Sequence, residues 1–210
     1  MPKVIGGSLK SHREHVTAQI YEAVGKLLYE RGYDALSLAD VAEACGMART
    51  AMYNYFPDKA ALIVGYATHE TEQYLERLDA ALGPIDNPVD QLRTYIRFQL
   101  EYFSGNHLPP GPALRLLLPE GAADGVMAHV HTLEDRLRHI VVTGGEERYL
   151  SVDDVPSTVS LISACISRAS SLAGSGADLE ETVRSTETFV LRAVGASLDA
   201  EGRPRRLRRR

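Results

Sequence analysis

Apolar residues recur at intervals of three and four along almost the whole chain, and no stretch of useful length alternates apolar with polar residues. This spacing predicts amphipathic helices rather than strands. Glycine and proline interrupt the pattern, as at Gly32, Gly46, Pro57, Gly144 and the segment 105–112. These interruptions divide the chain into about nine predicted helices. The fold class that we expect is therefore all-α.

The first two helices are predicted from an apolar stripe and a capping pattern. The stripe predicts a helix over residues 13–31, and Gly32 follows it as a residue that can adopt positive φ at the helix end. Ser37, with Asp40 three residues later, has the spacing of a capping box and begins a short second helix. That helix ends at Gly46.

The third predicted helix runs from Ala48 to about Tyr55, and Asp58 is placed to cap a long fourth helix. Two short helices joined by a tight turn with glycine, after a longer helix, are typical of a helix-turn-helix. Met47, directly after the turn, is expected to fill the small three-helix core. The outward face of the third helix is polar and aromatic: Arg49, Thr50, Tyr53, Asn54 and Tyr55.

These outward side chains suit a DNA surface. Arginine can form paired hydrogen bonds with guanine in the major groove, and tyrosine hydroxyl groups can reach phosphate oxygens. Lys59 lies in the first turn of the fourth helix, where its charge opposes the helix dipole, so we attribute it to a phosphate contact. The alternative is a purely structural bundle in which Tyr53 and Tyr55 cover the core.

Residues 37–62, SLADVAEACGMARTAMYNYFPDKAAL, resemble the DNA-binding signature of the TetR (tetracycline-repressor-like) family, and the similarity extends over about residues 13–62. The resemblance implies a dimeric all-α repressor with a three-helix N-terminal reader and a divergent ligand-binding, dimerising C-terminal domain. It implies base contacts from Arg49, Thr50 and Tyr53, and phosphate contacts from Ser37, Asn54, Tyr55 and Lys59. Ala48 departs from the family pattern, which often has a capping Ser or Thr there. Losing that cap costs about 1 kcal/mol.

The domain organisation that we expect has three parts. Residues 1–57 form the helix-turn-helix DNA-binding domain, and residues 58–202 form a larger all-helical ligand-binding and dimerisation domain. Residues 203–210 form a basic, disordered tail, which holds six of the chain's 23 Lys and Arg residues. Without the tail, 17 basic residues stand against 28 acidic ones, so DNA contact must come from a local surface rather than from overall charge.

Aromatic and polar residues of the C-terminal part predict a mostly apolar ligand pocket with a few polar groups. The effector that we expect is an unknown small molecule, apolar or aromatic. The alternative is that these residues are ordinary core. The candidate lining residues are Tyr95, Phe98, Gln99, Tyr102, Phe103, Leu117, Met127, His129, Val130 and Cys165. His131, Asp135 and His139 share a helix face that could support a metal ion, but we favour a solvated stripe and expect no metal or cofactor.

The last two long helices predict an association surface. Small residues recur along residues 161–174, and a narrow, mostly apolar face follows residues 183–198. Two such helices from each protomer would form a four-helix interface with twofold symmetry, and packing within one chain is the alternative. A homodimer also explains DNA selectivity, since two recognition helices about 34–36 Å apart would read a palindromic operator.

The function that we predict is a DNA-binding transcriptional regulator: a ligand-released repressor that binds its double-stranded operator as a dimer. It is expected to be cytoplasmic, because residues 1–10 have no apolar signal core, no membrane-spanning stretch occurs, and only two cysteines are present. We expect no enzyme activity, since no catalytic motif stands out. The alternatives are a transcriptional activator, or a helical small-molecule-binding protein without specific DNA binding.

Overall fold

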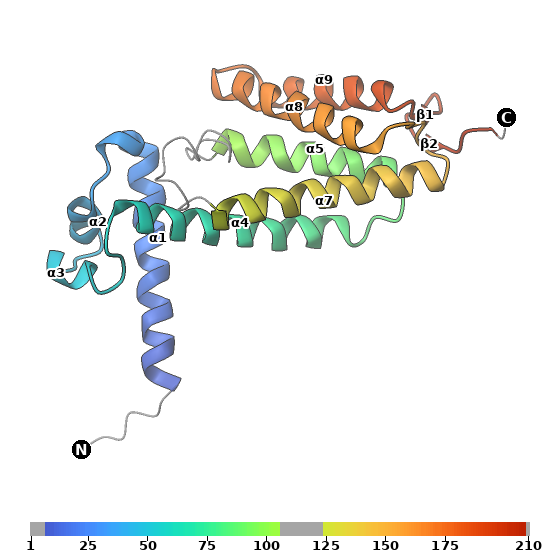
Figure 1. The fold of residues 1–210 in the computed structure, drawn as a ribbon. Helices are drawn as coiled ribbons and strands as arrows, with labels where there is room; N and C mark the ends of the chain where they lie inside the picture. Colours follow the sequence, from blue (N-terminus) through green and yellow to red (C-terminus); the bar gives the residue numbers. More distant parts are fainter. Residues whose placement is uncertain (1–6, 106–123, 209–210) are drawn as a thin grey trace. The chain divides into compact units, whose positions relative to one another are not determined.

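The computed structural model describes residues 7–105 and 124–208, and the side chains of residues 10–102 and 131–208. The described chain is helical apart from loops and one pair of two-residue strands, which confirms the all-α prediction (Figure 1). The elements are α1 (Gly7–Ala35), α2 (Leu38–Ala44), α3 (Arg49–Met52), α4 (Lys59–Leu82), α5 (Pro88–Gly105), α7 (Asp124–Glu146), α8 (Val155–Gly174), α9 (Leu179–Ala193), β1 (Ser197–Leu198) and β2 (Pro204–Arg205).

The chain divides into two compact units, and one boundary between them falls after Glu70, inside α4. This lies later than the domain boundary expected after residue 57. The reason is that the first turns of α4 belong to the core of the N-terminal unit, where Leu62 and Ile63 are fully buried and Tyr66 is nearly so. One continuous helix therefore contributes to both units.

The N-terminal unit is a small bundle of α1, α2, α3 and the beginning of α4. Gly32 interrupts α1 with φ +75°, a conformation that glycine adopts without strain. The Ser37 side chain accepts a hydrogen bond from the Asp40 amide, and the Asp40 carboxylate accepts one from the Ser37 amide, so the predicted capping box is confirmed. Asp58 caps α4 as predicted, accepting from the Ala61 amide at 2.7 Å.

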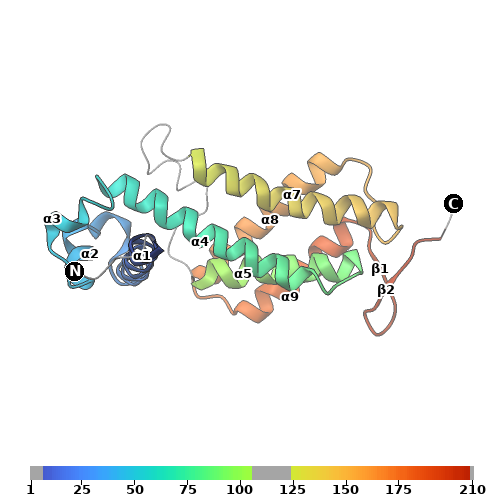
Figure 2. The same ribbon diagram turned by 90° about the horizontal axis from the view of Figure 1, so that it is seen from below.

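The second unit is built around α5. This helix packs against both α8 and α9, and those two helices pack against each other. On the other side of α5 lie α7 and the later part of α4 (Figures 1 and 2). An ion pair joins these two helices, with Arg136 Nε 2.7 Å from the Asp79 Oδ1. None of the helices in residues 7–105 and 124–208 has an apolar stretch long enough to cross a membrane.

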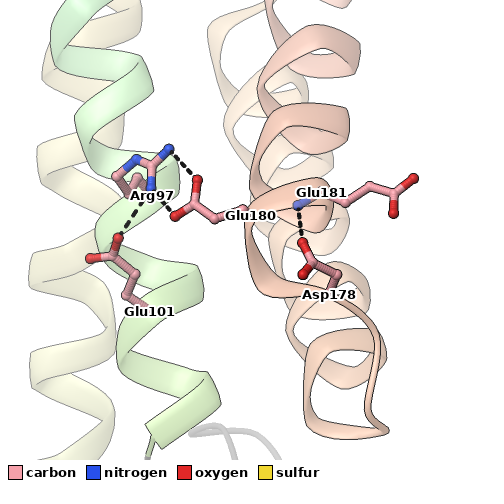
Figure 3. Close-up of polar contacts among 5 residues, drawn as sticks. All are labelled: Arg97, Glu101, Asp178, Glu180 and Glu181. Carbon is pink, nitrogen blue, oxygen red and sulfur yellow. Dashed lines mark hydrogen bonds and ion pairs between the residues drawn. The ribbon is translucent and has the colours of Figure 1, made fainter.

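Arg97 connects α5 to α9 through a bidentate ion pair (Figure 3). Its Nη1 lies 2.7 Å from the Glu180 Oε1, and its Nη2 lies 3.2 Å from the Glu180 Oε2. The same guanidinium group reaches the Glu101 Oε1 at 3.3 Å. Hydrogen bonding to Arg97 holds the pKa of Glu180 below its usual value of 4.5.

Replacing Glu180 with Gln is expected to lower the melting temperature at neutral pH but not in acid. Because the pKa of Glu180 is lowered by folding, its stabilising effect is complete above about pH 4.5 and is lost as the pH falls through the folded-state value. The effect will be modest, since both side chains are substantially exposed. Melting curves followed by circular dichroism between pH 7 and pH 3 measure it.

Glu181→Gln is the matched control. Glu181 also lies in the first turn of α9, but its side chain points away from Arg97 (Figure 3). Glu181→Gln should therefore not show the loss of melting temperature that appears at neutral pH and disappears in acid. A melting-temperature deficit of Glu180→Gln that persisted unchanged at pH 3 would contradict the ion-pair explanation.

The basic tail differs from the disordered segment that composition predicted. Leu198 pairs with Pro204 and Ser197 with Arg205 in an antiparallel register. The Arg203 amide donates to the Asp199 carboxylate at 2.8 Å, and the Leu207 amide donates to the Arg148 carbonyl. These bonds connect the backbone of the tail, as far as Leu207, to other residues of the second unit.

Candidate nucleic-acid interface

The third helix separates a buried face from an exposed polar face. Met52 is fully buried, and Phe56, one turn later, is 8% exposed. On the opposite side Arg49, Thr50 and Asn54 are exposed, and Tyr53 is 47% exposed. No Asp or Glu occurs between Glu43 and Asp58. The face is thus polar and aromatic, and its segment of the chain contains no acidic residue. This suits a surface that approaches phosphates.

The third helix is shorter than the predicted span from Ala48 to about Tyr55. Regular α-helix covers Arg49–Met52, and the chain then tightens, with the Asn54 amide donating to the Ala51 carbonyl and the Tyr55 amide to the Met52 carbonyl. Such bonds over three residues are common at helix ends. Ala48 stands at the N-cap without a side-chain cap, as its identity predicts. The exposed side chains therefore continue from the helix onto the following turn.

Ser37 and Lys59 already have partners within the protein. Ser37 is half-buried, and its hydroxyl caps α2 and also contacts the Asp40 carboxylate. Lys59 donates from Nζ to the carbonyl oxygen of Tyr33 at 2.6 Å, with its ammonium 4.3 Å from the centre of the Tyr33 ring. Lys59 thus places a cation at the C-terminal end of α1, where the helix dipole favours it. A phosphate is not needed to explain this lysine, although phosphate contact by either residue stays a prediction.

Replacing Ser37 with Ala is expected to destabilise the N-terminal unit by about 1 kcal/mol. The substitution removes the cap on the Asp40 amide and the hydrogen bond that lowers the pKa of Asp40. Urea denaturation at pH 7 measures the loss. Ser37→Thr, which keeps the hydroxyl, is the control and should retain most of the stability. Equal stability of the Ala and Thr variants would contradict the capping role.

Arg13 is a residue of this surface that the sequence interpretation missed. Its guanidinium lies 5.3 Å from the centre of the Tyr55 ring, and its Nη2 donates to the Asn54 carbonyl at 3.3 Å. Arg13 is exposed and precedes these residues by about forty positions. Sequence offered no signal for this contact, because helical spacing shows which face a residue occupies and not which distant residue it meets. The guanidinium group adds positive charge beside the exposed face of α3.

The candidate ligand residues fall into three groups. Tyr95, Phe98, Gln99 and Tyr102 belong to the core of the second unit, and Tyr74 on α4 joins them. Cys165 instead lines a groove formed by α8 and α9. The remaining candidates are Phe103, Leu117, Met127, His129 and Val130, whose side chains lie outside the described residues.

The groove on α8 and α9 is open, mostly apolar and about 660 Å³ in volume. Three of its side chains are large, apolar and exposed: Leu161 at 71%, Leu172 at 44% and Phe189 at 63%. Small residues such as Ala164 and Ala193 line the same groove. Sequence spacing predicted an association surface on both helices, and this stays a prediction; the exposure of Leu161 and Leu172 is evident only in the structure. The part of the chain with described side chains contains no group of three or more potential metal ligands.

Comparison with known sequences identifies relatives of part of this chain. The family described as "Bacterial regulatory proteins, tetR family" matches residues 20–65. The HTH-type transcriptional regulator TtgR of Pseudomonas putida is 33% identical over 97 residues, which are 45% of this chain and 44% of that protein. The probable regulator ArpR, also of Pseudomonas putida, is 35% identical over 79 residues, 37% and 38% of the two chains. The matches thus span less than half the length of these relatives, and both are named as transcriptional regulators rather than enzymes.

Solved structures of similar fold cover most of the chain. A putative transcriptional regulator from Saccharomonospora viridis in complex with choline has a TM-score of 0.75 at 18% identity, over 84% of this chain and 96% of that one. FadR from Bacillus subtilis in complex with stearoyl-CoA has a TM-score of 0.72 at 18% identity, over 82% of this chain and 96% of that one. At these identities the likeness concerns the fold alone.

Proposed function

We propose that this chain, which belongs to the tetR family of bacterial regulatory proteins, is a cytoplasmic repressor that binds a palindromic operator as a homodimer and is released from it by a small molecule. The observation that carries the proposal is the polar face of α3. Arg49, Thr50 and Tyr53 are exposed there, while Met52 behind them is fully buried. Packing of a helical bundle does not require such an exposed polar face, whereas hydrogen bonding to base edges in the major groove of DNA does.

In this proposal, residues of the same surface divide into two roles. Arg49, Thr50 and Tyr53 read base edges. Asn54, Tyr55, Ser37 and Lys59 contact the phosphate backbone and fix the position of the helix. Arg13, which lies against Tyr55, adds a further cation to the backbone contacts.

Dimerisation is supported by the groove on α8 and α9. The exposed Phe189 and Leu161 are too large and too apolar to be an ordinary part of a monomer surface when they adjoin one another in a groove. A second copy of α8 and α9, related by a twofold axis, would bury both side chains. The two DNA-binding domains of the dimer would then contact two half-sites that lie one helical turn of DNA apart.

Release would follow from a shift between two populations of the dimer. An effector bound in the second unit favours one arrangement of its helices, and α4 carries that change toward the N-terminal unit because it is one continuous helix. A differential effector affinity of about 3 kcal/mol would lower operator affinity on the order of 100-fold. The solved neighbours bound to choline and to stearoyl-CoA support a ligand in such a fold, without indicating which one this chain binds.

Selection of bound DNA from a random pool, at a fixed salt concentration, tests the proposal. The expected result is an enriched palindrome whose half-sites lie about 10 base pairs apart, centre to centre, or a multiple of that. Enrichment of no sequence would favour the alternative of a helical small-molecule-binding protein. The selected operator is then fused to a reporter gene. Lower reporter expression in the presence of the protein indicates repression, and higher expression indicates activation, the second candidate function.

A further inference from the structure

Two buried polar atoms in the second unit stand out because nothing pairs with them. Among the described residues, the Tyr74 hydroxyl on α4 and the Gln99 Oε1 on α5 are buried without a hydrogen-bond partner. Tyr74 is 1% exposed and Gln99 is 6% exposed. Buried polar atoms are nearly always paired, because an unpaired one has lost its bonds to water without replacement. Two such atoms in one unit therefore require an explanation.

The neighbouring hydrogen bonds define what each atom can offer. The Tyr95 hydroxyl lies 3.2 Å from the Leu133 carbonyl oxygen and donates its only proton to it. The Tyr95 oxygen therefore accepts from Gln99 Nε2, at 2.9 Å. This bond fixes the orientation of the Gln99 amide and leaves its Oε1 as an acceptor. Tyr74 is left as a donor.

The two atoms belong to one aromatic cluster. The Tyr74 ring centre lies 4.4 Å from that of Tyr102 and 5.6 Å from that of Phe98. Tyr95, Gln99 and Tyr102 are spaced by four and three residues, so they share one face of α5. Burial raises the pKa of Tyr74, and the nearby Tyr95 and Tyr102 raise it further, so its hydroxyl keeps its proton at neutral pH.

Among the described residues, the cluster offers no buried charge to a ligand. Besides Gln99, the buried polar residues of the described chain are Ser170 and Thr186, and their hydroxyls bond to carbonyls of their own helices at 2.8 Å and 2.7 Å. No described charged side chain is buried. The charges that act on its tyrosines come from Arg77, near Tyr74, and Glu134, near Tyr95, and neither side chain is buried, so solvent screens both. A carboxylate or ammonium group placed beside Tyr74 and Gln99 would therefore lose its hydration and gain only a screened counter-charge.

We infer that the effector is a neutral aromatic molecule bearing a hydroxyl group, whose oxygen accepts a hydrogen bond from Tyr74 and whose proton is donated to the Gln99 Oε1. A hydroxyl is the smallest neutral group that both accepts and donates. The rings of Phe98 and Tyr102 supply the aromatic surface against which the ligand ring packs. This assignment rests on the proposed function, in which the second unit binds the effector.

Isothermal titration of the full-length protein with three compounds of one ring system tests the assignment. The probes are 2-naphthol, 2-methylnaphthalene and 2-naphthoate, which carry a hydroxyl, an apolar and an anionic substituent. We expect 2-naphthol to bind at least about 10-fold more tightly than the other two. Tyr74→Phe should weaken 2-naphthol binding by about 3- to 10-fold and leave the hydrocarbon unaffected. Tightest binding of the carboxylate, equal binding of all three, or no binding of 2-naphthol would overturn the assignment.

The unliganded variants give a second, independent measurement. Tyr74→Phe removes an unpaired donor, so the melting temperature should rise by roughly 2–8 °C. Tyr95→Phe is the matched control: it removes a paired hydroxyl and leaves the Leu133 carbonyl and the Gln99 amide unpaired, so the melting temperature should fall. A fall in both variants would show that Tyr74 serves the fold alone and would overturn the inference.

Operator binding, measured in the same samples, separates this inference from the proposed function. Wild-type protein that binds its operator but fails the probe series contradicts the effector class alone. Protein that binds 2-naphthol through Tyr74 but no DNA contradicts the proposed function alone.

Discussion

Arg49→Ala is expected to remove sequence-selective DNA binding while leaving the fold and effector binding intact. A bidentate arginine–guanine contact is worth about 1–3 kcal/mol of discrimination, and a dimer presents two of them. The preference for operator over random DNA should therefore fall by about 30-fold to 20,000-fold. Arg49 is exposed at the start of α3 and makes no described contact with the core, so its loss should not alter the melting temperature.

Gel shifts with the selected operator and with a scrambled duplex, at matched salt, measure the discrimination. Arg138→Ala is the control, because it removes the same charge from an exposed position in the second unit. Among the described residues, the ion pair of Arg138 is a 3.9 Å contact with Asp135. It should leave the discrimination unchanged. If the Arg49 variant still distinguished operator from scrambled DNA, Arg49 would not be a base-reading residue.

Phe189→Glu is expected to convert the proposed dimer into monomers. Phe189 is 63% exposed in the groove of α8 and α9, and twofold symmetry would bury two copies of any substitution there. Two unpaired carboxylates in an apolar interface should weaken association on the order of 1,000-fold. Operator affinity should fall as the protomers dissociate, because a monomer has a single DNA-binding domain.

Analytical ultracentrifugation over a range of protein concentrations measures the association constant. Tyr29→Glu is the matched control, since Tyr29 is an aromatic residue of similar exposure, 68%, on α1. That variant should remain a dimer. A Phe189 variant that sedimented as a dimer at every concentration would place the interface elsewhere.

Local sequence features were enough to predict the helical fold and the exposed face of α3. The Ser37 and Asp40 pair predicted the start of α2, and Asp58 predicted the start of α4, because capping depends on residues three apart in the chain. The positions of Arg49 and Tyr53 followed from the same helical spacing. Such interactions extend over one helical turn, so the sequence contains all the information that they need.

Contacts between distant residues were not predictable in this way. The sequence suggested that Met47 fills the N-terminal core, but Met47 is only partly buried and Met52 is fully buried. It suggested that the charge of Lys59 needs a phosphate, but the carbonyl of Tyr33, 26 residues earlier, accepts its hydrogen bond. The ordered tail likewise depends on Arg148, nearly sixty residues before it.

By itself, then, the sequence determined the periodic helices, their caps and the exposed polar face of α3, since these arise from short-range spacing. Only the tertiary structure decided which buried polar atoms find partners, and it left the Tyr74 hydroxyl and the Gln99 Oε1 unpaired. The physical reason is that burial follows from the apolar period of one helix, whereas hydrogen bonding in the interior requires the positions of several helices at once.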